Sequence, residues 1–458
     1  MRKKPDHLFI KAVKDTMSYY LGLPEMHYLE GCADCQACAV SCPFYNAVSK
    51  RYSPKQKAEW LRKLYRREYT LSGKVLGALV GAWAPRNRDE AVKLVEYAYA
   101  CSNCGWCYYT CPHGIDSGAL IGMLRSVLYR YGEAPLPLKK MAKAEIEIIR
   151  GTPWRIQREW ASLVEELRER HNAVRAGKSK YMVLLDIYTG LLHRDLVHAY
   201  LDVLDAAGYS YAIPDRPLGI RPPLPLTLGY YEAAREVAEN VYNYAARNGA
   251  RVLVVLDGGY PYNDLKYLYP RYRARKPEEL EIVHVLEMIY AAYLADGLPA
   301  FTRYGRAAYI PSCNIDTRGG LGEARRLVEI TAEHYDKHLM WPYAGIGYLS
   351  LLLPETREKM DQYLLENLSA GDKHTERILK NIKLVAEYLA KEATKITPGV
   401  QVLSCMDDLY ALRNVEVKGL HPVHIAYWLR NHLAPSAKDL SKTVTQEILP
   451  RQITPRSP

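Results

Sequence analysis

The stretch Cys32-Ala-Asp-Cys35-Gln-Ala-Cys38-Ala-Val-Ser-Cys42-Pro43 has a counterpart further along the chain, Cys101-Ser-Asn-Cys104-Gly-Trp-Cys107-Tyr-Tyr-Thr-Cys111-Pro112. Both stretches follow the pattern C-x2-C-x2-C-x3-C-P, which is the spacing of bacterial-type cubane iron–sulfur binding. Three thiolates at steps of three residues on a tight loop can converge on three irons of one cube. The proline after the fourth cysteine cannot continue a preceding helix. The doubled pattern therefore predicts two 4Fe-4S clusters.

The spacing also predicts which cysteines share a cluster. In two-cluster ferredoxins, the fourth cysteine of each motif ligates the other cluster. We therefore expect cluster 1 to be held by Cys32, Cys35, Cys38 and Cys111, and cluster 2 by Cys101, Cys104, Cys107 and Cys42. Structural zinc sites also use four cysteines in C-x2-C pairs. They need neither the third cysteine at the same step nor the terminal Cys-Pro, so the pattern favours iron–sulfur over zinc.

Length and composition exclude several classes of protein. A chain of 458 residues, 48% hydrophobic and 25% charged, is globular and long enough for more than one domain. Only Cys313 and Cys405 lie outside the two motifs, so a disulfide scaffold is excluded. The longest apolar run, Val75–Ala84, is about half of the roughly 20 residues that a membrane-spanning helix needs. With no secretory signal after Met1, we expect a cytoplasmic protein.

The net charge of +11 suits an acidic partner or a lipid surface and does not by itself imply nucleic acid. Basic residues gather in Ser49–Tyr69, which has eight Lys or Arg against two Glu. Such a run is usually a solvated helix face. The alternative is a docking surface for an acidic redox partner or for anionic lipid.

The region around the two motifs is predicted to be helical. Residues 1–133 would form an α-helical ferredoxin domain, with helices at Lys55–Tyr69, Glu90–Ala100 (capped by Asp89) and Leu120–Tyr129. Residues 134–180 would form a connector of two helices, Leu138–Arg150 and Arg155–Arg175.

Strands and helices alternate after residue 180, which predicts an α/β domain with parallel sheet. The first unit, 181–298, has expected strands at Tyr181–Asp186, Ser210–Pro214 and Arg251–Leu256 and helices at Arg194–Ala207 and Tyr230–Arg247. The second, 299–435, has strands at Ala307–Ile310 and Val400–Leu403 and helices at Gly322–His334, Glu355–Glu366 and Glu376–Ala393. Each unit closes with a short extended segment and a His (His284, His424) before an apolar helix. This order predicts a duplicated domain, followed by a tail at 436–458.

The chain resembles the iron–sulfur proteins of the heterodisulfide reductase type (HdrD-like), whose relatives include the iron–sulfur subunits of anaerobic glycerol-3-phosphate dehydrogenase and of glycolate oxidase. The resemblance is specific at Cys32–Pro43 and Cys101–Asp116. It implies an α+β multidomain fold, in which an α-helical ferredoxin domain precedes two α/β repeats. Each repeat of the family has a single Cys, a Cys-Cys-Gly and a terminal Cys-x-x-Cys.

Most cysteines of these repeats are missing from this chain. The second repeat keeps Cys313 and Cys405, has Asp408 in place of the last cysteine, and has no thiol in Trp341–Gly347. In the first repeat the corresponding places are Tyr188, Arg216–Gly219 and Asp257–Pro261. Two thiols cannot supply the ligands of a further cluster, so disulfide chemistry at such a cluster is in doubt here.

The resemblance and the motifs together imply an electron-transfer subunit of a multi-subunit oxidoreductase, heterodisulfide reductase-like or associated with an FAD-linked dehydrogenase. The expected partners are a flavoprotein dehydrogenase, a heterodisulfide reductase-like subunit or a membrane quinone-reactive subunit, with membrane contact only through that partner. No GxGxxG follows a strand, so no flavin or NAD of its own is expected. One alternative is a thiol–disulfide reductase that uses Cys313 and Cys405 as a redox or ligand pair, rather than as inert remnants. Another is a basic nucleic-acid-binding protein with a structural cluster.

Overall fold

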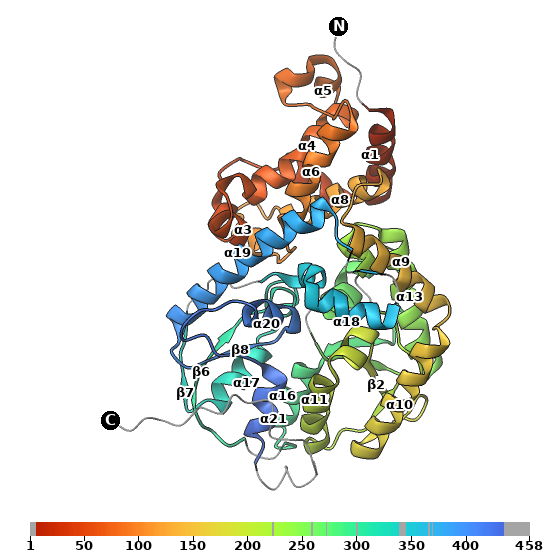
Figure 1. Ribbon diagram of the computed structural model, residues 1–458, viewed down its shortest axis with the longest axis vertical. Coiled ribbons are helices and arrows are strands. Elements are labelled where there is room, and N and C mark those ends of the chain that lie inside the picture. Colours follow the sequence, from red (N-terminus) through yellow and green to blue (C-terminus); the bar gives the residue numbers. More distant parts are fainter. Residues whose placement is uncertain are drawn as a thin grey trace.

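The computed structural model describes residues 6–221, 224–257, 260–271, 273–298, 301–338, 345–364, 367–368 and 370–434. Helices alone form the N-terminal part, which lies at one end of the long axis (Figure 1). Two parallel sheets and their covering helices form the other end. The predicted tail at 436–458 lies outside the described residues.

The N-terminal part surrounds the two cysteine motifs with short helices. These are α1 (His7–Tyr20), α2 (Leu23–Glu30), α3 (Pro43–Ala47), α4 (Pro54–Tyr69), α5 (Leu71–Leu76), α6 (Arg88–Tyr99), α7 (Trp106–Tyr109) and α8 (Ser117–Arg130). Helix α4 begins as predicted, since the Ser53 side chain accepts a hydrogen bond from the Gln56 N–H and proline follows it. The predicted cap of α6 is wrong. Asn87, not Asp89, caps the helix by accepting from the Glu90 N–H, and Asp89 lies in the first turn.

Two helices, α9 (Leu136–Arg150) and α10 (Trp154–Arg170), connect the N-terminal part to the sheets. The helix expected over Arg155–Arg175 is wrong at its end, because residues 173–175 form strand β1. The ring of His171, just after α10, binds the Asp205 carboxylate at 2.7 Å. This contact lies where the chain leaves the helix, and β1 then pairs with β3 in the sheet.

The first sheet has the strand order β1-β3-β2-β4-β5, with every pair parallel. Its strands are β1 (Ala173–Arg175), β2 (Tyr181–Leu184), β3 (Tyr211–Ile213), β4 (Val252–Val255) and β5 (Glu281–His284). The helices of this unit include α11 (Arg194–Ala206), α13 (Tyr231–Arg247) and α16 (Val285–Leu294), with shorter pieces α12 (Leu224–Thr227), α14 (Tyr260–Asn263) and α15 (Tyr269–Arg271).

The second sheet has the order β7-β6-β8-β9, again with every pair parallel. Its strands are β6 (Arg306–Ile310), β7 (His334–Tyr335), β8 (Val400–Leu403) and β9 (Pro422–His424), and its helices are α17 (Glu323–Thr331), α18 (Pro354–Leu364), α19 (Lys373–Ile396), α20 (Met406–Arg413) and α21 (Ile425–His432). The helix predicted over Gly322–His334 therefore runs too far. The chain turns into β7, where Asp336 forms an ion pair with Arg306 at 2.7 Å.

Helix α19 lies along the boundary between the two parts of the molecule (Figure 1). It contacts α3 and α6, and Arg377 on α19 forms an ion pair with Glu96 on α6 at 2.7 Å. The observed fold confirms a mixed molecule in which a helical part precedes two parallel sheets. Among the described helices, none has the length and apolarity that a membrane crossing requires.

Candidate iron–sulfur centre

The two cysteine loops share an unusual backbone conformation. Asp34 and Asn103, each just before the second cysteine of its motif, have φ angles of +56° and +57°. Gln36 and Gly105, each just after that cysteine, have φ angles of +58° and +84°. Side-chain-bearing residues seldom adopt this left-handed region. Its repetition at matching positions shows that both loops are held in one shape; in the second loop the Asn103 N–H donates to Cys101 Sγ at 3.3 Å.

Four thiols line one small cavity of about 20 Å3. They are Cys42, Cys101, Cys104 and Cys107, the four predicted for cluster 2. Phe44, Pro54 and Ile121 form apolar walls of the same cavity. Three of the thiols come from the second motif and one from the first, so the structure brings together residues from both ends of the helical insert, as ligand exchange requires.

The remaining motif cysteines form a more open group. Burial raises the pKa of the Cys38 thiol to about 11, and the thiolates of Cys111, Cys32 and Cys42 act in the same direction. Cys111 of the second motif and Cys32 of the first are thus both close to Cys38, as the predicted cluster 1 set requires. Cys35 is exposed, whereas Cys42, Cys101 and Cys107 of the other group are buried.

The thiols at the buried cavity are better suited to binding a metal cluster than to carrying unbalanced negative charge. Burial, then Cys101 and Cys42, raise the pKa of Cys104 to about 12, and the pKa of Cys107 lies well above its usual value. Thiolates that share one buried space repel each other, as the effect of Cys101 and Cys42 on Cys104 shows. Bound iron reverses this preference, because a metal ion deprotonates a coordinating thiol and takes up its charge.

Besides Arg125, which donates to the Cys101 carbonyl, two cationic side chains adjoin the cluster 2 loop. The Lys57 ammonium lies 3.4 Å from Cys42 Sγ and donates to the Ala100 carbonyl at 2.6 Å. From the second sheet, Arg318 donates to the Asn103 carbonyl at 2.8 Å and pairs with Asp116 at 3.0 Å, while Thr317 donates to the Cys104 carbonyl at 2.6 Å. The loop after β6 thus rests directly on the cluster 2 loop.

Sequence reasoning missed both cations. Lys57 belongs to the basic run Ser49–Tyr69, whose composition favours a solvated face. Its position in the helix could have predicted that Lys57 is buried, because Pro54, Ala58 and Leu61 are buried at helical spacing around it on α4. Arg318 follows a strand in another domain, and no local pattern predicts that it reaches Asn103.

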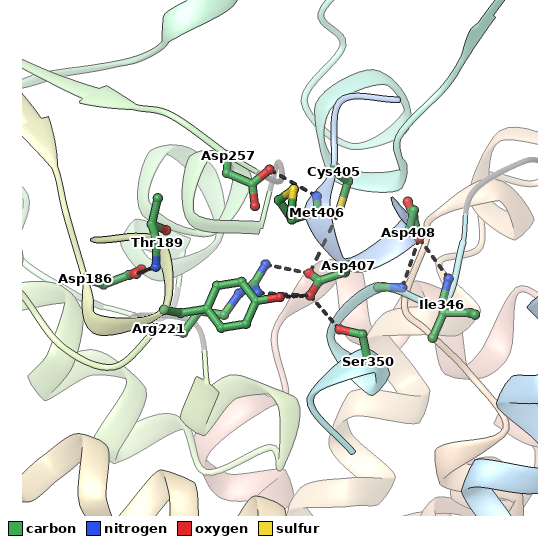
Figure 2. Close-up of polar contacts among 12 residues, drawn as sticks. Asp186, Thr189, Arg221, Asp257, Ile346, Ser350, Cys405, Met406, Asp407 and Asp408 are labelled. Carbon is green, nitrogen blue, oxygen red and sulfur yellow. Dashed lines mark hydrogen bonds and ion pairs between the residues drawn. The ribbon is translucent and has the colours of Figure 1, made fainter. Parts of the chain in front are cut away.

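The second candidate site, around Cys405, proves to be a buried ionic network (Figure 2). The Arg221 guanidinium binds Asp407 with two hydrogen bonds of 3.0 and 2.5 Å. The Tyr188 hydroxyl donates to the same carboxylate at 2.9 Å and the Ser350 hydroxyl at 2.5 Å. Cys405 lies beside it, with Sγ 3.8 Å from Asp407 Oδ2.

Two carboxylates, Asp257 and Asp408, lie at positions that the sequence analysis matched to family cysteines. Asp257 accepts from the Met406 N–H and contacts the His424 ring, both at 3.1 Å. Asp408 accepts from the backbone N–H groups of Ile346 at 3.0 Å and Gly347 at 3.4 Å. Burial raises the pKa of Asp408 to about 7. The segment 216–219 runs beside the end of β2, where the Leu218 N–H donates to the Leu185 carbonyl at 3.1 Å.

Cys313 and Cys405 lie at the same edge of the second sheet. They follow β6 and β8, neighbouring parallel strands in which Ile310 pairs with Leu403, so both positions lie at the carboxyl edge of the sheet. The side chain of Cys313 lies outside the described residues, as do residues 341–344 of the predicted Cys-Cys-Gly position. Cys405 is only 1% exposed.

Residues 28–115 match the family of 4Fe-4S dicluster domains. The chain is 36% identical over 126 residues to the Hdr-like menaquinol oxidoreductase iron-sulfur subunit 2 of Archaeoglobus fulgidus. These residues make up 27% of this chain and 22% of that protein. The chain is also 32% identical over 106 residues to the Hdr-like menaquinol oxidoreductase iron-sulfur subunit of Archaeoglobus profundus. These residues make up 23% of this chain and 19% of that protein.

The matched part therefore spans about a fifth of the length of each curated relative. No solved structure matches the chain. The match supports 4Fe-4S binding by residues 28–115, and the similarity of the chain to heterodisulfide reductase-like iron–sulfur subunits is confirmed.

Proposed function

We propose that this chain is an electron-transfer subunit that relays single electrons through two 4Fe-4S clusters within a larger redox complex. The observation that carries the proposal is the cavity at which Cys42 of the first motif meets Cys101, Cys104 and Cys107 of the second. Crossed ligands of this kind hold two clusters close together in ferredoxins.

The proposed ligands are those that the spacing predicts: Cys32, Cys35, Cys38 and Cys111 for cluster 1, and Cys101, Cys104, Cys107 and Cys42 for cluster 2. A bound cubane cluster supplies reversible one-electron chemistry. The chain supplies the rest. The left-handed loops fix the thiols, the walls of the cavity exclude water from cluster 2, and the exposure of Cys35 leaves cluster 1 nearer the surface.

The part after residue 180 is proposed to be a duplicated domain that serves as a docking and assembly platform. Strand order supports the duplication, because β3-β2-β4-β5 and β7-β6-β8-β9 place their first, second, third and fourth strands alike. His284 and His424 also play equivalent roles. Each ends the fourth strand and caps the next helix by accepting from the N–H two residues on, at 3.3 and 3.2 Å.

The partners are proposed from the two relatives, which are named as iron–sulfur subunits of Hdr-like menaquinol oxidoreductases. We infer that this chain also works beside other redox subunits: a flavoprotein dehydrogenase, a heterodisulfide reductase-like subunit or a quinone-reactive membrane subunit. Such a partner would bring it to the cytoplasmic face of the membrane.

The surroundings of Cys405 favour a relay over a thiol–disulfide reductase. The thiol is 1% exposed and adjoins the Asp407 carboxylate, which raises rather than lowers the cost of forming a thiolate. A nucleophilic thiol needs access and a nearby positive charge, and here the Arg221 charge is already paired with Asp407.

The test is anaerobic iron and sulfide quantitation with low-temperature EPR on wild type and Cys42→Ser. We expect about eight irons per wild-type chain. In Cys42→Ser, the signal of cluster 2 should be lost or altered while that of cluster 1 persists, although Cys42 lies in the first motif.

Cys405→Ser is the matched control and should keep all the iron and both signals. A wild-type protein loaded with zinc would contradict the proposal. So would a Cys42→Ser variant that alters only the cluster bound by the first three cysteines, because the ligands would then not cross.

A further inference from the structure

One buried charge of the helical part has no carboxylate to balance it among the described residues. Lys57 is 1% exposed, and no described carboxylate lies within ion-pair distance of its ammonium. Its contacts are Cys42 Sγ, the Ala100 carbonyl and the face of the Phe44 ring, whose centroid lies 5.4 Å away. A lysine is rarely buried without a compensating charge, because desolvation of the ammonium is costly.

The thiols of the cavity provide the compensation. The Lys57 ammonium lies 3.4 Å from Cys42 Sγ, and Cys101 and Cys107 lie around the same space. Lys57 itself lines the same cavity as these three cysteines. The Lys57 ammonium therefore lies next to the cluster that these cysteines would bind.

Reduction of a cluster adds one negative charge to it. Hydrogen bonds to the sulfurs, net charge and solvent exposure set the reduction potential. The cluster 2 cavity is buried, and burial alone disfavours the more negative, reduced state. A fixed ammonium 3.4 Å from a ligand sulfur favours that state, both by its charge and by hydrogen bonding.

We propose that Lys57 is a positioning residue that raises the reduction potential of cluster 2 and so offsets the effect of its burial. This inference rests on the proposed function, since it requires a cluster at Cys42, Cys101, Cys104 and Cys107. The Arg318 guanidinium on the other side of the loop is less suited to this role, because Asp116 neutralises it at 3.0 Å. In the cluster 1 set, Cys35 is exposed to solvent.

The experiment is a potentiometric EPR titration of the reconstituted full chain, with Lys57→Met and Lys57→Gln. Methionine keeps the volume and removes the charge, and glutamine keeps a hydrogen-bond donor without the charge. In Lys57→Met the one-electron equilibrium constant for reducing cluster 2 should fall at least tenfold, which is 59 mV. Lys57→Gln should show a smaller fall, and the potential of cluster 1 should change less than that of cluster 2 in both.

The matched control is Lys63→Met, which removes the same charge from the same helix. The Lys63 ammonium lies over the Trp60 ring, 4.5 Å from its centroid, and both potentials should stay at their wild-type values. The signal altered in Cys104→Ser identifies cluster 2 in each titration.

The outcomes separate the two proposals. If wild type holds no iron, the proposed function fails. If wild type and both Lys57 variants hold about eight irons and the potential of cluster 2 is unchanged, only the role of Lys57 is overturned. If both variants lose the cluster 2 signal, Lys57 is required for assembly, and the tuning role is rejected.

Discussion

The helical part and the sheet part bury charge in different ways. At the cluster 2 cavity, thiols meet beside Lys57, and their charge requires a metal to stabilise it. In the interior of the sheet part, Arg221 and Asp407 form a buried ion pair. Two hydroxyl groups also donate hydrogen bonds to the Asp407 carboxylate. In the proposed function a cofactor completes the first arrangement, whereas the second is complete within the chain. The comparison shows how polar groups at the strand ends of the sheet part can be buried without a metal.

The largest effect should come from Arg221→Met, which breaks the ion pair that closes the sheet part. Asp407 would be left buried beside Asp257 and Asp408. Removal of one partner of a buried pair costs about 3–5 kcal/mol. We expect a loss of that size in the free energy of unfolding, measured by chemical denaturation under anaerobic conditions.

Two further variants sharpen this result. Arg221→Met combined with Asp407→Asn should recover part of the loss, because no unpaired charge remains. Arg377→Met removes an ion pair of the surface, where the Arg377 side chain is 64% exposed, and should cost less than about 1 kcal/mol. Equal losses from Arg221→Met and Arg377→Met would show that the buried network does not hold the sheets together.

A smaller effect, with a defined pH dependence, is expected at Asp408. Burial and the neighbouring Asp407 raise its pKa to about 7, so the folded chain holds a proton that the unfolded chain has released above its usual pKa of about 4. This contribution to stability is complete below about pH 4 and is lost as the pH rises through 7. Asp408→Asn should therefore be more stable than wild type at pH 8, by on the order of 1 kcal/mol, with no gain at pH 4.

Asp336→Asn gives a control of opposite sign. The Arg306 guanidinium lowers the pKa of Asp336, so its contribution is present at neutral pH and is lost as the pH falls through the lowered pKa. This variant should be less stable than wild type at pH 8. A flat difference between wild type and Asp408→Asn from pH 4 to pH 8 would contradict the role assigned to Asp408.

The smallest effect compares the two cysteine loops directly. Gln36 and Gly105 occupy matching left-handed positions, and only glycine adopts this conformation without strain. Gln36→Gly should raise the free energy of unfolding of the cluster-loaded protein by about 0.4–1 kcal/mol. The gain should appear as a higher midpoint temperature for the loss of visible absorbance on heating.

Gly105→Ala should act in the opposite direction. A Cβ at residue 105 would lie 2.9 Å from Cγ of Arg318, which covers this loop from the sheet part. Destabilisation by Gln36→Gly would show that the side chain of Gln36 makes a contact that the loop needs.

The sequence predicted the helical part well, because cysteine spacing is a local signal. The motifs also led to the set of thiols that the structure brings to one cavity, since the exchange of a fourth cysteine follows from known cluster geometry. The ends of helices were less predictable. Strands β1 and β7 have three and two residues, and pairing with distant strands, rather than local propensity, makes them strands.

The contacts of single charged residues were the least predictable feature. Arg221 pairs with Asp407, which lies 186 positions further along the chain, and Arg318 reaches back 215 positions to Asn103. Both contacts arise from the packing of one domain against another. No local pattern in the sequence predicts which loops come together at these two contacts.

The crossed origin of the cluster 2 cavity has a consequence for biosynthesis. Its lining comes from residues 41–57 and 101–121, so a nascent chain that has emerged only as far as the first motif offers one of the four thiols of this cavity, Cys42. Iron delivered at that stage would meet four thiols from one motif alone. Correct loading therefore has to wait until the second motif and α8 have left the ribosome, and maturation is expected to follow translation of the whole helical part.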